Sequence, residues 1–178
     1  GSARFCTQTN PPFDKGRLNA EIMNEVQDAL ANGGSADLSF DISNLDRSIG
    51  ATLSGAIAQA HGNAGRRDQS FNISLNGTAG QSLGVWLAGG VNLDLTGDAN
   101  DYVGKGMAGG RIVIKPHNGV AFKAEDAAIA GNTCLYGATG GELFASGRAG
   151  ERFAVRNSGA LAVVEGIGDN GCEYMTGG

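Results

Sequence analysis

Residues 104–109 fit the G-x-G-x-x-G pattern that holds the pyrophosphate of a dinucleotide in many enzymes. Such a site needs a strand before the pattern, a long helix after it and an acidic residue about 20 positions further on. Here an alternating run at 111–114, typical of a strand, follows at once. The same glycine positions recur elsewhere beside different side chains. We therefore interpret these glycines as backbone corners and predict no cofactor-binding residue in this chain.

Histidine and cysteine give no metal or nucleophile pattern. His61 and His117 are the only histidines, and neither has a cysteine or a second histidine at metal-ligand spacing. We interpret both as solvated loop residues and predict no metal site. Cys6, Cys134 and Cys172 are widely spaced and odd in number, which favours a reducing, cytoplasmic location over a disulfide framework. Cys134 and Cys172 occupy similar repeat positions, which indicates core residues.

Carboxylates and arginines gather near the glycine-rich corners. Some proteins that cleave polysaccharides place acidic and basic side chains on one face of such repeats, so an acid–base site is one interpretation. The other is a set of solvated corners with local ion pairs, each worth about 0–1 kcal/mol. We favour the second and predict no catalytic residue. The residues concerned are Asp98, Asp101, Glu165, Asp169, Glu173, Arg148, Arg152 and Arg156.

The composition limits the class of protein. Glycine accounts for 31 of 178 residues, more than twice the usual share of about 7%, yet there are only 3 prolines, which excludes collagen. The formal net charge of −5 argues against a nucleic-acid partner. No apolar run is long enough to cross a bilayer, so we predict no membrane partner.

An internal repeat must position these residues. Copies begin near residues 48, 82, 103, 134, 153 and 172, and the glycine pairs recur at intervals of about 20 residues, which is typical of a solenoid. Insertions near 62–70 and 116–128 account for two longer intervals. The expected corner glycines are Gly89, Gly90, Gly109, Gly110, Gly140, Gly141, Gly159, Gly177 and Gly178.

Alternating runs after the glycines, at 91–95, 111–114, 143–145 and 161–164, predict short strands. We therefore expect an all-β fold, a right-handed parallel β-helix (a solenoid) with one short N-terminal helix. Residues 1–37 would be a lead-in with a capping helix at 17–31, and 38–178 the β-helix, cut off mid-coil. Its open C-terminal coil would then pair with another copy of the chain.

Glycine-containing stretches occupy residues 46–50, 76–84, 97–110, 131–141, 147–153, 155–159 and 165–178. Together these stretches resemble the C-terminal GXGXG domain of the large subunit of glutamate synthase. The resemblance implies a parent enzyme that converts glutamine and 2-oxoglutarate into two glutamates. It also implies an amidotransferase domain and an FMN-binding barrel with an iron–sulfur cluster as partners. In that family the GXGXG domain is regarded as a scaffold, and no catalytic or cofactor residue maps onto the matching positions.

Two alternatives remain open from the sequence. One is a β-helix subunit related to that of formylmethanofuran dehydrogenase, which shares the glycine-pair repeat. The other is a stand-alone carbohydrate-active β-helix, which would normally carry more aromatic side chains than the 6% found here. The scaffold interpretation, without activity of the chain by itself, is the one we favour.

Overall fold

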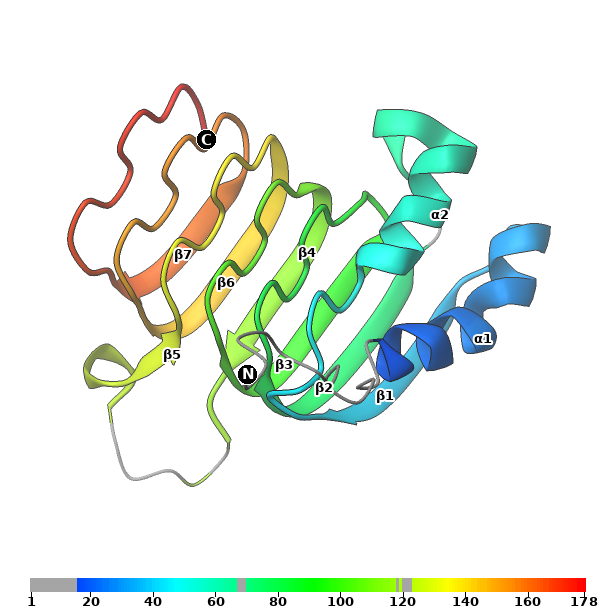
Figure 1. Cartoon of the computed structure of the whole chain (residues 1–178), viewed down its shortest axis with the longest axis horizontal. Helices are drawn as coiled ribbons and strands as arrows, with labels where there is room; N and C mark the ends of the chain where they lie inside the picture. Colours follow the sequence, from blue (N-terminus) through cyan, green and yellow to red (C-terminus); the bar gives the residue numbers. More distant parts are fainter. Residues whose placement is uncertain (1–15, 67–69, 118, 120–122) are drawn as a thin grey trace, which may run out of the picture.

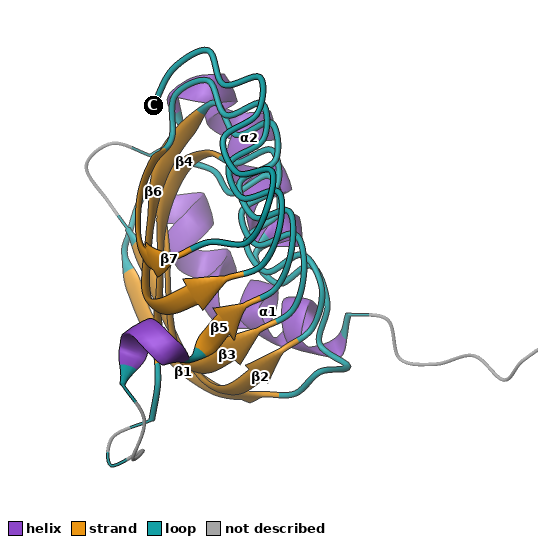
Figure 2. Ribbon diagram, turned by 90° about the vertical axis from the view of Figure 1, so that its left-hand side faces the viewer, coloured by secondary structure: helices purple, strands orange, loops and turns teal. Residues whose placement is uncertain are grey.

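A computed structural model describes residues 16–66, 70–117, 119 and 123–178, so the irregular lead-in and Cys6 lie outside the described residues. The described part has two layers (Figures 1 and 2). One layer is a parallel β-sheet, and the other is a stack of short turns that faces it. Two α-helices, α1 and α2, lie at the end of the sheet formed by β1 (Figure 1).

Seven strands form the sheet, in the order β1-β2-β3-β4-β6, with β7 beside β6. Strand β5 lies at the same level as β4, because Ala130 pairs with Ala99 of β3 and with Ala149 of β6. Among the described residues between β4 and β5 lies the short 3₁₀ helix η2. The strands are β1 (Ala36–Ile42), β2 (Phe71–Ala79), β3 (Val91–Ala99), β4 (Ala108–Lys115), β5 (Ala128–Ala130), β6 (Gly140–Ala149) and β7 (Leu161–Gly166); η2 is Ala124–Asp126.

The strands stack in register with a nearly constant sequence interval. Phe71 pairs with Val91, Asn92 with Arg111, and Glu142 with Leu161, each step being 19 or 20 residues. Two longer steps, from β1 to β2 and from β4 to β6, contain α2 and the segment 116–127. The four alternating runs expected as strands lie within β3, β4, β6 and β7.

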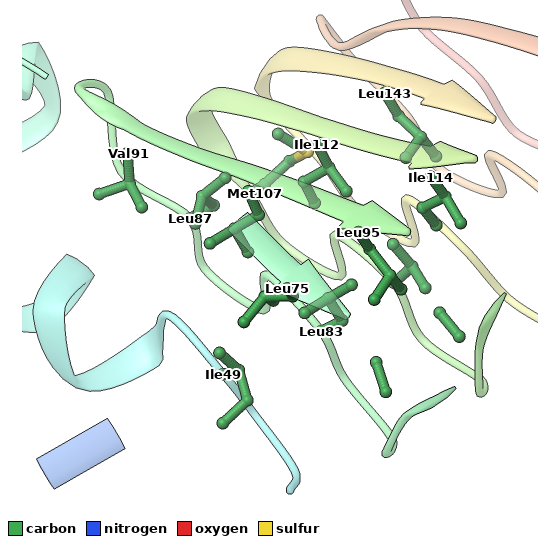
Figure 3. Packing of buried hydrophobic residues seen from close by; sticks show 14 of the residues in the cluster. Ile49, Leu75, Leu83, Leu87, Val91, Leu95, Met107, Ile112, Ile114 and Leu143 are labelled. Carbon is green, nitrogen blue, oxygen red and sulfur yellow. The ribbon is translucent and has the colours of Figure 1, made fainter. Parts of the chain in front are cut away.

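Side chains point alternately to the two faces of the sheet, so one face is buried and the other is exposed to solvent. Inward side chains of neighbouring strands pack with residues from the turns, as Figure 3 shows. Outward polar side chains form a ladder: Asn92 Nδ2 donates to Asn72 Oδ1 at 2.8 Å, and Asn72 Nδ2 donates to Asp37 Oδ1 at 2.7 Å. The labelled core residues are Ile49, Leu75, Leu83, Leu87, Val91, Leu95, Met107, Ile112, Ile114 and Leu143.

Helix α1 (Arg17–Asn32) confirms the helix predicted over 17–31. Leu18, Ile22 and Val26 lie on one face and are buried. The helix ends at Gly33, which has φ +72° and donates its backbone N–H to the carbonyl of Ala29.

The prediction of an all-β, right-handed parallel β-helix with one short helix is wrong. The structure is a mixed α/β fold, in which one seven-stranded parallel sheet accompanies α1 and a second helix, α2 (Ala51–His61). The glycines and small residues of 48–62 align with 82–97, which suggested another strand repeat. Instead Leu53 and Ile57, four residues apart, are buried on one face of α2, and its alanines favour a helix. The layer opposite the sheet consists of turns rather than strands.

Candidate functional site

The glycine-rich pattern maps onto the layer of turns, which we call the turn wall. It consists of residues 81–86, 101–106, 132–137, 151–156 and 169–174, stacked on one another opposite the sheet (Figure 2). In each turn the second, fourth and sixth residues have positive φ, as in Tyr102 (+66°), Gly104 (+64°) and Gly106 (+62°). The non-glycine residues in this conformation are Ser82, Trp86, Tyr102, Thr133, Leu135, Arg152, Ala154, Arg156, Asn170, Cys172 and Tyr174, and Ser48 before α2 is the remaining one described.

Residues of positive φ alternate with residues of negative φ along each turn, and neighbouring turns exchange backbone hydrogen bonds. Tyr102 N–H donates to Asn132 O at 2.9 Å, Gly104 N–H donates back to Leu83 O at 2.8 Å, and Gly106 N–H donates to Tyr136 O at 2.8 Å. Each turn therefore binds both the turn before it and the turn after it, so the wall is held by a continuous backbone network.

The G-x-G-x-x-G pattern cannot serve as a phosphate cradle in this fold. The N–H groups of Gly104 and Gly106 are used between turns, and Gly109 N–H donates to Leu87 O at 3.1 Å. A dinucleotide site needs free N–H groups at the start of a helix, whereas strand β4 follows here.

The corner glycines lie where each turn passes into the next strand. The second glycine of each pair has positive φ, from +73° at Gly110 to +113° at Gly178. The first glycine lies against the backbone of the preceding level: a Cβ on Gly109 would lie 2.7 Å from Gly89 N, and one on Gly140 would lie 2.7 Å from Ala108 O. It remains a prediction that folding depends on the corner glycines. The others in this set are Gly89, Gly90, Gly141, Gly159 and Gly177.

Asn19 closes the turn wall at its first end. Its side chain is buried, Oδ1 accepts from Gly50 N–H at 3.1 Å, and Nδ2 donates to Ser48 O at 3.1 Å. In the next turn, the equivalent N–H of Gly84 donates to the carbonyl of Ile49 in the level before it. Asn19 thus supplies from α1 the acceptor that a preceding turn would supply. The sequence analysis did not single it out, although a polar residue beside the apolar stripe of α1 is the available signal.

The predicted carboxylate and arginine residues are not brought together into an acid–base site. None of the five carboxylates forms an ion pair with any of the three arginines in the described part. Asp98 accepts from Thr78 Oγ1 at 2.8 Å, and Asp101 Oδ1 accepts from the backbone N–H of Asn132 at 2.7 Å. Arg152 lies 3.9 Å from its neighbour Glu151. Asp169 and Glu173 accept bonds through their backbone carbonyls, Arg148 packs beside Gly166, and Arg156 and Glu165 are exposed.

The histidines and cysteines also lie apart. His61 ends α2 and is exposed, while His117 borders a cavity of about 270 Å³ together with Asp98 and Ile129. Among the described residues no three histidine, cysteine or acidic side chains come close enough to hold a metal ion. Over the same residues no helix combines the length and apolar character that crossing a bilayer requires.

Cys134 is buried and Cys172 is exposed. Burial raises the pKa of the Cys134 thiol to about 12, and the charge of Asp101 acts in the same direction. A group with this pKa is a thiol rather than a thiolate at neutral pH, so it is a poor nucleophile.

We expect this thiol to make folding stability fall at alkaline pH. The unfolded thiol ionises near its ordinary pKa of 9.0 while the folded one stays neutral to about 12, so the stabilisation is present below pH 9 and is lost as pH rises from 9 to 12. Between pH 8 and pH 10.5 the wild type should lose about 2 kcal/mol more unfolding free energy than Cys134→Ala, measured by urea denaturation. Equal losses of unfolding free energy in the two proteins would contradict the raised pKa of the Cys134 thiol.

Replacing Arg156 by glycine should stabilise the folded protein. It is exposed and has φ +57°, a conformation that disfavours side chains with a Cβ. We expect Arg156→Gly to raise the free energy of unfolding by about 0.5 kcal/mol after the entropy cost of glycine. Arg47→Gly is the control, because Arg47 is exposed without positive φ and should lose about 0.5–1 kcal/mol. Parallel losses in both variants would rule out strain at Arg156.

Three features define the class of this domain: the in-register sheet, the turn wall that faces it, and positive φ at every second residue of each turn. It is a glycine-repeat domain in which the backbone conformation is what repeats. A sequence profile described as "GXGXG motif" matches residues 19–178. The chain belongs to the GXGXG motif family.

Curated relatives agree with this assignment. The chain is 53% identical over 162 residues to glutamate synthase [NADH] of Schizosaccharomyces pombe; the alignment covers 91% of this chain and 8% of the relative. It is 48% identical over 177 residues to the glutamate synthase [NADPH] large chain of Azospirillum brasilense; the alignment covers 99% of this chain and 12% of the relative. It is 55% identical over 154 residues to the chloroplastic ferredoxin-dependent glutamate synthase 2 of Arabidopsis thaliana; the alignment covers 86% of this chain and 9% of the relative. The chain thus spans about a tenth of the length of these relatives.

Proposed function

We propose that this chain is a structural domain of a glutamate synthase large chain, without catalysis of its own. The observation that carries the proposal is the identity of about half to glutamate synthases over nearly the whole chain. The geometry supports it, because the backbone groups of the glycine pattern are used between turns and the charged side chains lie apart.

The parent enzyme would make two glutamates from glutamine and 2-oxoglutarate in a cytoplasmic setting. Its amidotransferase domain and FMN barrel would be the partners of this domain, and FMN and an iron–sulfur cluster would be bound there. Relatives whose names specify NADH, NADPH and ferredoxin are similar to this chain to nearly the same degree. This favours a domain that does not select the electron donor. These relatives do not favour the two alternative β-helix functions.

A domain exchange tests the proposal. The segment of the Azospirillum brasilense large chain that aligns with this chain would be replaced by residues 1–178. We expect the chimaera to keep its turnover and its preference for NADPH, and we expect the 178-residue chain alone to hydrolyse no glutamine. Turnover by the isolated chain, or a changed electron donor in a folded chimaera, would overturn the proposal.

A further inference from the structure

The outer side of the turn wall, which faces away from the sheet, carries a patch of aromatic, apolar and basic side chains (Figure 2). The patch is formed by the fifth and sixth residues of the first four turns. Two of its members, Val85 and Val155, are buried yet do not belong to the core cluster, so they pack among side chains on the outer side of the wall. We call it the aromatic patch, and its residues are 85–86, 105–106, 136–137 and 155–156.

The aromatic patch differs in charge from the chain as a whole. It contains two cations, Lys105 and Arg156, and no carboxylate, and the two residues that follow it in each turn are uncharged as well. The whole chain, in contrast, has a formal net charge of −5. Lys105 also lies beside a further aromatic ring, with Nζ 5.3 Å from the centroid of Tyr102. The patch is therefore a basic, aromatic region on an acidic protein.

Trp86 and Arg156 occupy the patch in a conformation that destabilises the folded chain. Each is the sixth residue of its turn, with φ of +54° and +57°, where the second and third turns have glycine. Positive φ disfavours a bulky side chain by about 1–2 kcal/mol. Trp86 is 65% exposed and Arg156 is exposed, so burial against the described residues does not offset this strain. Strain at an exposed site points to a function, and tryptophan and arginine are among the residues that dominate protein–protein binding energy.

The two glycines between these residues leave room for one more ring. A Cβ on Gly106 would lie 2.8 Å from Trp86 Cδ1, so the indole rests on the backbone of Gly106. In the next turn, no heavy atom of the described residues, beyond the chain neighbours of Gly137, lies within 4 Å of the position of its Cβ. Successive turns are about 4.8 Å apart, the spacing of neighbouring strands. An open position about one turn wide therefore lies between the indole and Arg156.

We propose that the aromatic patch docks an extended acidic segment of a partner protein that projects one aromatic side chain. The projecting ring rests on Gly137, between the indole of Trp86 and the side chain of Arg156. Carboxylates on both sides of that ring in the partner sequence approach Lys105 and Arg156, and their attraction adds to the contact between the rings. A second copy of the chain fits less well, because two basic patches would repel each other. This inference does not depend on the proposed role in glutamate synthase.

The probe is the peptide Ser-Glu-Glu-Phe-Glu-Glu-Ser, added to the whole chain. With a fluorescein label on the peptide, we expect saturable one-to-one binding by fluorescence anisotropy with a Kd below about 100 μM, weakened by added salt. Trp86 is the only tryptophan, so the unlabelled peptide should shift its emission to shorter wavelength as the ring covers the indole. No saturable binding of this peptide, or binding without a change in the emission, would overturn the proposal.

Two altered peptides test the chemistry of the partner. Alanine in place of phenylalanine removes the ring, and lysine in place of each glutamate reverses the charge. We expect each change to weaken binding at least about tenfold. Equal affinity of all three peptides would refute the proposed recognition of a ring between carboxylates.

A matched pair of variants of the chain separates binding from folding. Arg156→Gly and Arg152→Gly each remove one charge from an exposed residue with positive φ in the same turn, +57° and +55°. Only Arg156 belongs to the aromatic patch, so only its replacement should weaken peptide binding, by at least about tenfold, although it stabilises the fold. Weaker binding by a more stable protein excludes misfolding as the cause. The proposal is wrong if the two variants bind the peptide equally well.

Two other occupants are outcomes of the same test. Bases of single-stranded DNA stack on basic aromatic surfaces, so a thymidine oligomer of about eight nucleotides is the first alternative. Tighter binding of this oligomer than of the peptide would overturn the proposal; the net charge of the chain favours the peptide. Light scattering tests the second alternative, since a dimer that Trp86→Gly dissociates would show that a second copy occupies the patch. The self-association expected from the sequence, through the last coil, involves other residues and stays a prediction.

Discussion

Replacing Gly97 by alanine should lower the free energy of unfolding by about 4 kcal/mol or more. Gly97 lies in β3 with φ +145°, opposite Gly77 of β2, and a Cβ there would overlap the carbonyl oxygen of Gly77. The obstacle is backbone of a paired strand rather than the flexible end of a side chain, so relief requires the two strands to separate. Because β2, β3 and β4 are paired in series, the loss extends across the sheet. Urea denaturation followed by circular dichroism measures it.

Gly137→Ala is the matched control. Gly137 also has positive φ, at +63°, but no heavy atom lies within 4 Å of the position of its Cβ. Its substitution should cost only the conformational preference, about 1 kcal/mol. Similar losses in the two variants would show that φ alone, and not the close approach of β2 and β3, determines the need for Gly97.

Replacing Asn19 by leucine should lower the free energy of unfolding by about 2 kcal/mol. The change nearly conserves volume but removes the acceptor for Gly50 N–H and the donor to Ser48 O. Gly50 N–H would stay under α1 without an acceptor, and such a buried group costs about 1–3 kcal/mol. Ser48 O would still accept from Ala51 N–H at 3.1 Å. The same urea titration measures the change.

Asn24→Leu is the control, since Asn24 is exposed on the same helix. It should change stability by no more than about 0.5 kcal/mol. The capping role of Asn19 is refuted if both variants unfold at the same urea concentration as the wild type. Hydrogen exchange at Gly50 should also accelerate in Asn19→Leu alone, since its N–H loses its acceptor.

The sequence predicted the strands and α1 better than it predicted the turn wall. Alternation at 91–95 and 161–164, and the apolar spacing of Leu18, Ile22 and Val26, depend on local geometry, so each pattern could be recognised without the tertiary structure. Residues 48–62 misled the analysis, because glycines and alanines suit a tight turn and a short helix alike. Only the burial of Leu53 and Ile57 against the neighbouring levels decides between them.

The left-handed positions were harder to predict, because their residue types vary. The second turn, 101–106, has glycine at two of its three positive-φ positions, whereas the fourth, 151–156, has Arg152, Ala154 and Arg156. At these positions hydrogen bonds to the neighbouring turns offset the local conformational preference, and those partners lie about 20 or 30 residues away.

The alternation in the turn wall also has a spectroscopic consequence. Residues of positive φ alternate there with residues of negative φ, and we expect the two conformations to contribute to the far-ultraviolet circular dichroism with opposing sign. The turn wall is ordered and hydrogen-bonded, yet its signal should largely cancel, and the spectrum should report mainly the helices and the sheet. A secondary-structure content fitted from such a spectrum would therefore assign to irregular coil a part of the chain that is as regularly bonded as the sheet it faces.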